Sequence, residues 1–218
     1  MDNWPGMEND PDAQARIKKA CDMLDAKDGM KILDIGCHKQ EALAYLPPKA
    51  FYTGINDTVL VPGTVRMNID GGFRLDQKAD RILCLEVLEH LECPLGTLEV
   101  IQSVLQDDGV LVVSLPNEAT LFHRIRCLLG IVDQECFVYG GKHLHLPSLA
   151  QSRAFLRKEF EIVEEAYYIS HCALGTRQEI VANLIRVLPK QFLELLANVL
   201  PSLFARGFIF KLVKKQSR

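Results

Sequence analysis

The stretch ADRILCLEVLEHLECP, residues 79–94, followed after a helix-length segment by GVLVVSLPN, residues 109–117, decides the fold of this chain. An apolar run, Ile82–Leu85, leads into a cluster of carboxylates and a histidine, and a second apolar run covers Val110–Leu115. Two short apolar runs joined by a helix are typical of a strand–helix–strand unit in a parallel sheet. Polar residues at the carboxyl end of such a strand lie where open α/β sheets bind ligands.

Strand and helix signals alternate on both sides of this stretch. Apolar residues near helical spacing predict a first helix over Asp12–Asp25, which Asp28-Gly29 ends. The alternation predicts an α/β fold with a doubly wound, mostly parallel sheet. The predicted strands are Lys31–Cys37, Phe51–Ile55, Val65–Ile69, Arg81–Leu85, Val110–Leu115, Phe160–Ala166 and Phe208–Val213, and the other predicted helices are Gln40–Leu46, Leu95–Leu105 and Pro147–Lys158.

The last forty residues carry a different pattern. Apolar residues within 180–188 and 192–204 predict two helices, punctuated by Pro189 and Pro201, and the second has a polar opposite face. We therefore expect a single domain over residues 1–218. It comprises a core at 12–175, amphipathic helices at 176–206, and a closing strand with a basic tail at 207–218.

Composition narrows the class of protein. The chain has 218 residues, of which 48% are hydrophobic and 24% charged, as in an ordinary globular domain. No apolar run is long enough to span a membrane, and the N-terminus lacks the pattern of a signal peptide. The seven cysteines form no C-x-x-C pair. We therefore expect reduced thiols and a cytoplasmic location, without a disulfide framework or zinc site.

Charge is distributed unevenly along the chain. Residues 176–218 hold eight basic and two acidic side chains, so this tail carries +6 and the remainder −9 of the overall −3. Phosphate binding needs clustered positive charge. The acidic body therefore argues against DNA as a partner and makes RNA an unfavourable one.

The segment around LEVLEHLECP resembles the class I S-adenosylmethionine-dependent methyltransferases of the type 11 and MetW-like families. The resemblance covers about residues 15–170. It implies a Rossmann-like sheet of seven strands with an antiparallel last strand, and S-adenosylmethionine as the cofactor. Methyl transfer from a sulfonium is a direct displacement, so the protein mainly aligns the donor and the acceptor.

In that family the first strand ends in an acidic residue and a glycine-rich turn. Here the turn reads DIGCHKQ, residues 34–40, and keeps Asp34 and Gly36, while His38 and Gln40 stand where glycines are usual. Either these side chains reshape the cofactor site, or the turn no longer holds the methionine moiety. The resemblance implies cofactor contacts from this turn and from the end of the fourth strand, at Asp34, Gly36, Cys37, His38, Leu85 and Glu86.

Two further cofactor contacts follow from the resemblance. The family places a carboxylate after the second strand to hold the ribose hydroxyls, and this chain has Asn56 followed by Asp57. The same Asn-Asp pair also favours an Asx turn that only ends the strand, and the two interpretations stay open. Asp70 matches the acidic residue that reaches the adenine amino group, and Gly71 leaves room beside it.

Glu86, Glu89 and His90 follow the spacing i, i+3, i+4, which places them on one helical face or turn. His143 and His145 add two imidazoles downstream. The pattern resembles ubiquinone O-methyltransferases and small-RNA 2′-O-methyltransferases, in which it holds a divalent metal, but it also occurs in metal-free type 11 members. A metal site, a general base at His90, His143 or His145, and a structural role are the alternatives; we predict no bound metal.

The function expected from these features is O-methylation of a small molecule or a glycan- or lipid-linked precursor. The basic amphipathic C-terminus favours the lipid-linked acceptor and peripheral contact with the inner face of a membrane. A different hypothesis is a protein that keeps the fold without catalysis and acts as a binding or regulatory partner. A third, RNA 2′-O-methylation, rests only on the Glu-Glu-His resemblance.

Overall fold

The structure is a computed structural model that describes residues 10–70, 73–117, 119–130, 143–145, 147–169 and 190–215. For residues 122, 126 and 190 it describes the backbone alone. Gly71 and the predicted helix within 180–188 lie outside these ranges.

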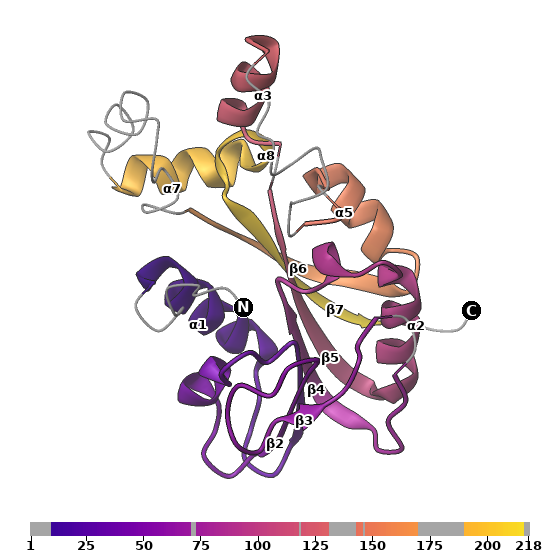
Figure 1. The fold of residues 1–218 in the computed structure, drawn as a ribbon. Coiled ribbons are helices and arrows are strands. Elements are labelled where there is room, and N and C mark those ends of the chain that lie inside the picture. The colour runs from indigo at the N-terminus through magenta and orange to yellow at the C-terminus, as the bar shows by residue number, and fades with distance from the viewer. Residues whose placement is uncertain are drawn as a thin grey trace.

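Seven strands form one sheet in the order β3-β2-β1-β4-β5-β7-β6 (Figure 1). β1 to β5 pair in parallel, and β7 lies antiparallel between β5 and β6. The predicted doubly wound sheet with an antiparallel last strand is therefore confirmed. The strands are β1 Lys31–Ile35, β2 Phe51–Asn56, β3 Val65–Arg66, β4 Ala79–Leu85, β5 Leu105–Pro116, β6 Phe160–Tyr168 and β7 Gly207–Lys214.

Helices cover both faces of the sheet (Figure 1). On one face, α1 (Pro11–Leu24) and the 3-10 helix η2 (Glu41–Tyr45) pack on a core that includes Ile32, Leu83 and Val112. On the other face, α2 (Pro94–Val104) and α5 (Leu149–Leu156) pack on a larger core. The central strands are buried on both faces, which explains their continuous apolar runs.

Local caps fix where two of these helices begin. The Asp10 carboxylate accepts hydrogen bonds from the amides of Asp12 and Ala13 (2.9 and 3.3 Å), with Pro11 at the first helical position of α1. Ser148 and Gln151 form a reciprocal capping box at the start of α5.

Three short helices lie at the carboxyl end of the parallel strands (Figure 1). They are α3 (Leu121–Leu128), α7 (Lys190–Val199) and α8 (Pro201–Phe204). The buried Asn117 side chain donates to the Ala205 carbonyl (2.8 Å), which ties the end of β5 to the chain entering β7. In the described part of the chain, no helix is long and apolar enough to cross a membrane.

Several predicted boundaries are wrong. The strand expected from Val110 already begins at Leu105, which pairs with Ala79 before a bulge, so 107–109 interrupt a strand rather than end a helix. The predicted helix at residues 40–46 is a single 3-10 segment, and the strand predicted at 65–69 pairs only over Val65–Arg66. Propensity does not register the two changes in the strands because they depend on sheet pairing.

The turn after β1 approaches the turn after β4 very closely. Gly36 has φ +74°, and a Cβ atom there would collide with Cγ2 of Val87. Gly29 has a similar φ of +82°, but open space surrounds the position of its absent Cβ. Substitutions at the two glycines therefore distinguish the cost of a left-handed backbone from the cost of close packing.

We predict that Gly36→Ala destabilises the fold more than Gly29→Ala. In the Gly29 variant, a left-handed alanine lowers the free energy of unfolding by about 1–2 kcal/mol. In the Gly36 variant, overpacking against Val87 lowers it by about 1–3 kcal/mol more. Urea unfolding of both variants gives the two losses in the free energy of unfolding. Equal losses would contradict the close packing of the two turns.

Candidate functional site

The strand order reverses between β1 and β4, which is where open α/β sheets bind ligands. Among the described residues, four that are not glycine have positive φ: Asp25, His38, Gln40 and Glu86. Three of them lie in the turns after β1 and β4. Each costs about 1–2 kcal/mol of backbone strain, and such strain gathers at functional sites. The residues with a strained backbone therefore lie at the same place in the sheet where the strand order reverses.

Asp34 lies at the end of β1 and is almost fully buried. Its carboxylate accepts a hydrogen bond from the Tyr52 hydroxyl on β2 at 2.7 Å. Burial raises the pKa of Asp34 to about 6, although the bond from Tyr52 opposes this shift. The predicted cofactor residue thus sits under the turn, with one of its oxygens bound to a tyrosine.

The turn at 36–40 keeps a left-handed backbone at His38 (φ 44°) and Gln40 (φ 61°). His38 Nδ1 lies 2.8 Å from Glu41 Oε1, and the other Glu41 oxygen accepts from the Lys39 amide at 3.1 Å. The Gln40 side-chain amide donates to the Thr64 hydroxyl at 3.0 Å. Both side chains that replace the usual glycines are therefore engaged with neighbouring side chains.

The backbone of this turn rests on the end of β2. The amides of Gly36 and Cys37 both donate to the Ile55 carbonyl, at 2.9 and 3.2 Å. Cys37 fills the space that a side chain at Gly54 would need, and burial raises the pKa of its thiol to about 11. The neutral thiol donates toward Thr64 Oγ1 at 4.0 Å.

Asn56 ends β2, and its side-chain amide donates to the Thr58 carbonyl at 2.9 Å. An Asx turn would instead have the side-chain oxygen accept from a backbone amide, so this bond does not decide between the two interpretations of the sequence. The Asn56 Oδ1 accepts no hydrogen bond from the described residues, so a hydroxyl can still bind there. Asp57 follows on an exposed turn.

The Asp70 carboxylate caps the entry to α2. Its two oxygens accept from the amides of Glu92 and Cys93, each at 2.8 Å. A carboxylate offers about four lone-pair sites, so two remain for a ligand such as an amino group. Asp70 therefore has a structural role that the sequence did not indicate, and its predicted contact with adenine stays a prediction.

Glu86 does not share a helical face with Glu89 and His90, so that expectation is wrong. The 3-10 helix η3 covers only Leu88–His90, and Glu86 precedes it with φ 54°. Positive φ turns the Glu86 side chain away from the helical path. The i, i+3, i+4 spacing requires a continuous helix, which the end of β4 does not provide.

The Glu86 carboxylate instead joins a partly buried polar network on the α1 side of the sheet. One oxygen accepts from the Ser114 hydroxyl at 2.8 Å and the Tyr168 hydroxyl at 3.3 Å, and the other lies 3.6 Å from Arg16 Nη1. The Arg16 guanidinium also lies 5.7 Å from the centre of the Tyr168 ring. Burial raises the pKa of Tyr168, so its hydroxyl stays protonated and donates.

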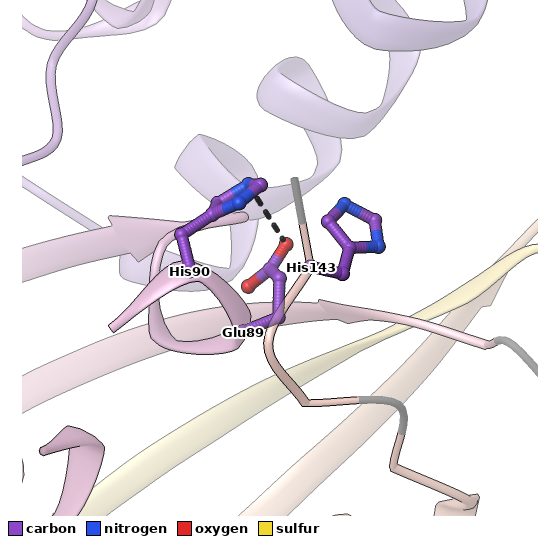
Figure 2. A group of neighbouring side chains, drawn as sticks. All are labelled: Glu89, His90 and His143. Atoms are coloured by element: carbon purple, nitrogen blue, oxygen red, sulfur yellow. Dashed lines mark ion pairs between the residues drawn. The ribbon is translucent and has the colours of Figure 1, made fainter. Parts of the chain in front are cut away.

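Glu89, His90 and His143 form a second cluster, in which the two imidazoles flank one carboxylate (Figure 2). Glu89 is 1% exposed, and its Oε1 lies 3.9 Å from His90 Nε2. The two rings are 4.8 Å apart between centroids. The structure therefore brings together two of the three predicted catalytic histidines.

The third histidine anchors the chain instead. His145 Nε2 donates to the Leu91 carbonyl at 2.9 Å, which leaves Nδ1 as its basic nitrogen. The amides of Leu144 and His145 both donate to the Glu89 carbonyl, at 2.8 and 3.1 Å. These bonds hold the 143–145 segment, and with it His143, against η3.

The second cluster has the chemistry of a metal site. Its ligand atoms all lie within 4.8 Å of one another, and one carboxylate with two imidazoles suits several divalent transition metals. Metal–ligand bonds of about 2.1 Å require these atoms to lie closer, roughly 3 Å apart. To hold an ion, the three ligand groups therefore have to move closer together. The residues therefore fit a divalent metal as well as a proton acceptor.

The sequence did not indicate several residues that shape the site. Ser114 had a usable signal, because it is the polar residue near the carboxyl end of an apolar strand. Arg16, Tyr52, Thr64 and Tyr168 act through contacts with distant parts of the chain, which no local pattern reveals.

The sequence of residues 11–165 matches the family described as "Methyltransferase domain". No curated protein is similar enough in sequence to match the chain. Several solved structures are similar to it in fold, at sequence identities below 20%.

One similar structure is a chain from a Haloferax volcanii complex between the Trm112 methyltransferase activator and a methyltransferase. It has a TM-score of 0.63 and 14% identity, and the match covers 97% of this chain and 93% of that one. The N-methyltransferase NodS from Bradyrhizobium japonicum, with S-adenosyl-L-homocysteine, has TM-score 0.60 and 14% identity, with coverage of 99% and 93%. The small RNA methyltransferase HEN1 has TM-score 0.60 and 16% identity, but only 26% of its chain is covered, against 95% of this one. These likenesses show the fold.

The raised pKa of Asp34 predicts a pH effect on stability. The folded state holds a proton on Asp34 up to about pH 6, whereas the ordinary carboxyl value is 3.8. Stability from this group is therefore full below pH 4 and falls as the pH rises to 6, by about 3 kcal/mol. Asp34→Asn cannot ionise and should lack this fall.

Urea unfolding between pH 4 and 7 measures the effect as the difference between the wild type and Asp34→Asn. The exposed Asp108→Asn serves as the matched control, because its carboxyl is in solvent. A difference between the wild type and Asp34→Asn that stays constant with pH would show that Asp34 is not held protonated.

Proposed function

The chain belongs to the methyltransferase-domain family, and from this premise we propose that it methylates an oxygen of its acceptor with S-adenosylmethionine. We further propose that the acceptor is a small molecule or a glycan- or lipid-linked precursor. The observation that supports this proposal best is that backbone strain and a histidine–carboxylate cluster meet at the switch point of the sheet.

The residues at the switch point fit the cofactor. Gly36 allows the turn after β1 to lie against Val87, and Asn56 keeps an oxygen for a ribose hydroxyl. Asp70 retains lone pairs for the adenine amino group. The other proposed contacts are Asp34, Cys37, His38, Asp57, Gly71, Leu85 and Glu86. When bound, S-adenosylmethionine supplies an electrophilic methyl group.

His90 and His143 are proposed to prepare the acceptor. An imidazole within hydrogen-bond reach of a hydroxyl can remove its proton as the oxygen attacks. The buried Glu89 carboxylate beside His90 stabilises the imidazolium that results. The backbone bonds from 144 and 145 to Glu89 keep His143 in place. His145 then acts mainly as an anchor, although Nδ1 leaves it a basic nitrogen.

The helices near the site support an acceptor with an apolar part. On α7, Leu195 and Val199 are 56% and 64% exposed, and on α3 Leu128 is 86% exposed. Both helices lie at the carboxyl end of the sheet, as the candidate site does (Figure 1). Their exposed apolar side chains favour the lipid-linked acceptor and a peripheral contact with a membrane surface.

Calorimetric titration with S-adenosylmethionine and S-adenosylhomocysteine, with and without magnesium or manganese, tests the cofactor. We expect dissociation constants in the micromolar range, since cofactor sites are usually tuned near that range. Stronger binding or turnover with the metal would favour a metal-activated acceptor at Glu89, His90 and His143. If neither nucleoside binds, the proposed methyltransferase activity is contradicted, and a protein without catalysis that acts as a binding partner is favoured.

His90→Gln and His143→Gln should each lower kcat toward a hydroxyl acceptor found by screening. The expected loss is about 100-fold or more, with loss of the rise in rate with pH, because glutamine cannot accept the proton. Binding of S-adenosylhomocysteine should remain within about twofold of wild type, a change near 0.4 kcal/mol.

His123→Gln is the matched control, since His123 lies on α3 and contacts Thr120, the residue that precedes this helix. If the cluster variants keep wild-type kcat, or lose activity only in parallel with the control, the proton-acceptor role is excluded.

A further inference from the structure

The turn after β1 holds two disfavoured backbone conformations that its side chains have to maintain. His38 and Gln40 are both left-handed, a region in which glycine is comfortable and other residues are not. Unless other contacts hold it, such a turn relaxes toward ordinary backbone angles. The contacts that hold these residues therefore decide the shape of the turn.

Of the side-chain hydrogen bonds described for His38 and Gln40, the one from Gln40 reaches beyond the turn. His38 binds Glu41, three residues away, so this contact shapes the turn locally. Gln40 donates to Thr64, 24 residues away, at 3.0 Å. The local contact of His38 cannot fix where the turn lies relative to the sheet. The bond from Gln40 to Thr64 can, and it adds to the backbone bonds from Gly36 and Cys37 to Ile55.

Thr64 lies in the segment that connects β2 with β3, and this segment starts at Asp57, directly after Asn56 at the end of β2. The bond to Gln40 therefore joins the two chain segments that carry the proposed methionine and ribose contacts. The Cys37 thiol reaches the same Thr64 hydroxyl at 4.0 Å. Two residues of one turn thus converge on one hydroxyl of the other segment.

We propose that the hydrogen bond from Gln40 to Thr64 is a clasp that holds the turn after β1 in the shape that binds the cofactor. Gln40 and Thr64 are then positioning residues for S-adenosylmethionine. This inference rests on the proposed function. The clasp replaces the conformational freedom of glycine with a fixed side-chain contact, so the turn is organised before the ligand arrives.

The test compares Gln40→Ala, Thr64→Val and the double variant with the wild type, using S-adenosylhomocysteine as the calorimetric probe. Both single variants remove the bond while leaving a Cβ at position 40. We expect each to weaken binding about tenfold, as one lost hydrogen bond allows. The double variant should lose no more than the larger of the two single losses, because both substitutions break the same bond and Thr64→Val also removes the partner of the Cys37 thiol.

Two further variants distinguish the loss of the Gln40–Thr64 bond from the general effects of removing a glutamine side chain. Gln40→Gly removes the bond but also the strain, so it should bind within about threefold of wild type. Gln102→Ala removes a similar amide contact, from Gln102 to the Glu159 carbonyl at 3.1 Å, on α2 and away from the site. It should leave binding unchanged.

Hydrogen exchange of the amides at 36–41 supplies a readout that needs no ligand. Exchange should speed up in Gln40→Ala and Thr64→Val but not in Gln102→Ala. Unchanged exchange and unchanged binding in both clasp variants, or additive losses in the double variant, would overturn the proposal. Failure of the wild type to bind S-adenosylhomocysteine would refute the proposed function and the ligand assigned to the clasp. Exchange would still show whether the clasp holds the turn.

Discussion

The contact between Gly36 and Val87 sets how the two turns at the switch point of the sheet approach each other. Because no side chain fits between them, the turn after β1 lies directly against the turn after β4. The amides of Gly36 and Cys37 fix the same turn to the end of β2. The ends of three parallel strands are thereby brought together, and most of the proposed cofactor contacts lie at these ends, with Asp70 in the segment after β3.

The left-handed conformation of Glu86 divides the polar groups after β4 into two sets. Glu86 itself joins Ser114, Tyr168 and Arg16, which ties α1 to the ends of β5 and β6. Glu89 and His90, on η3, meet His143 (Figure 2). One strained residue therefore serves both the attachment of the first helix and the exposure of the proposed proton acceptor.

The sheet could be predicted from the sequence because its central strands are buried on both faces and appear as continuous apolar runs. Val110–Leu115 is such a run, and all seven strands were expected near their observed positions. The site was less accessible to prediction. Spacing placed Glu86 with His90, since periodicity assumes a regular helix, and the positive φ of Glu86 breaks that assumption. The capping by Asp70 and the clasp at Thr64 link residues more than 20 positions apart, which local patterns do not encode.

We propose that the turns after β1 and β4 form a preshaped site for S-adenosylmethionine. A crystal structure of the protein with S-adenosylhomocysteine would show whether they do. We predict the nucleoside at the carboxyl ends of β1, β2 and β4, with His38 and Gln40 still left-handed and the bond from Gln40 to Thr64 intact. A nucleoside bound elsewhere, or a turn that abandons these conformations to admit it, would contradict the account.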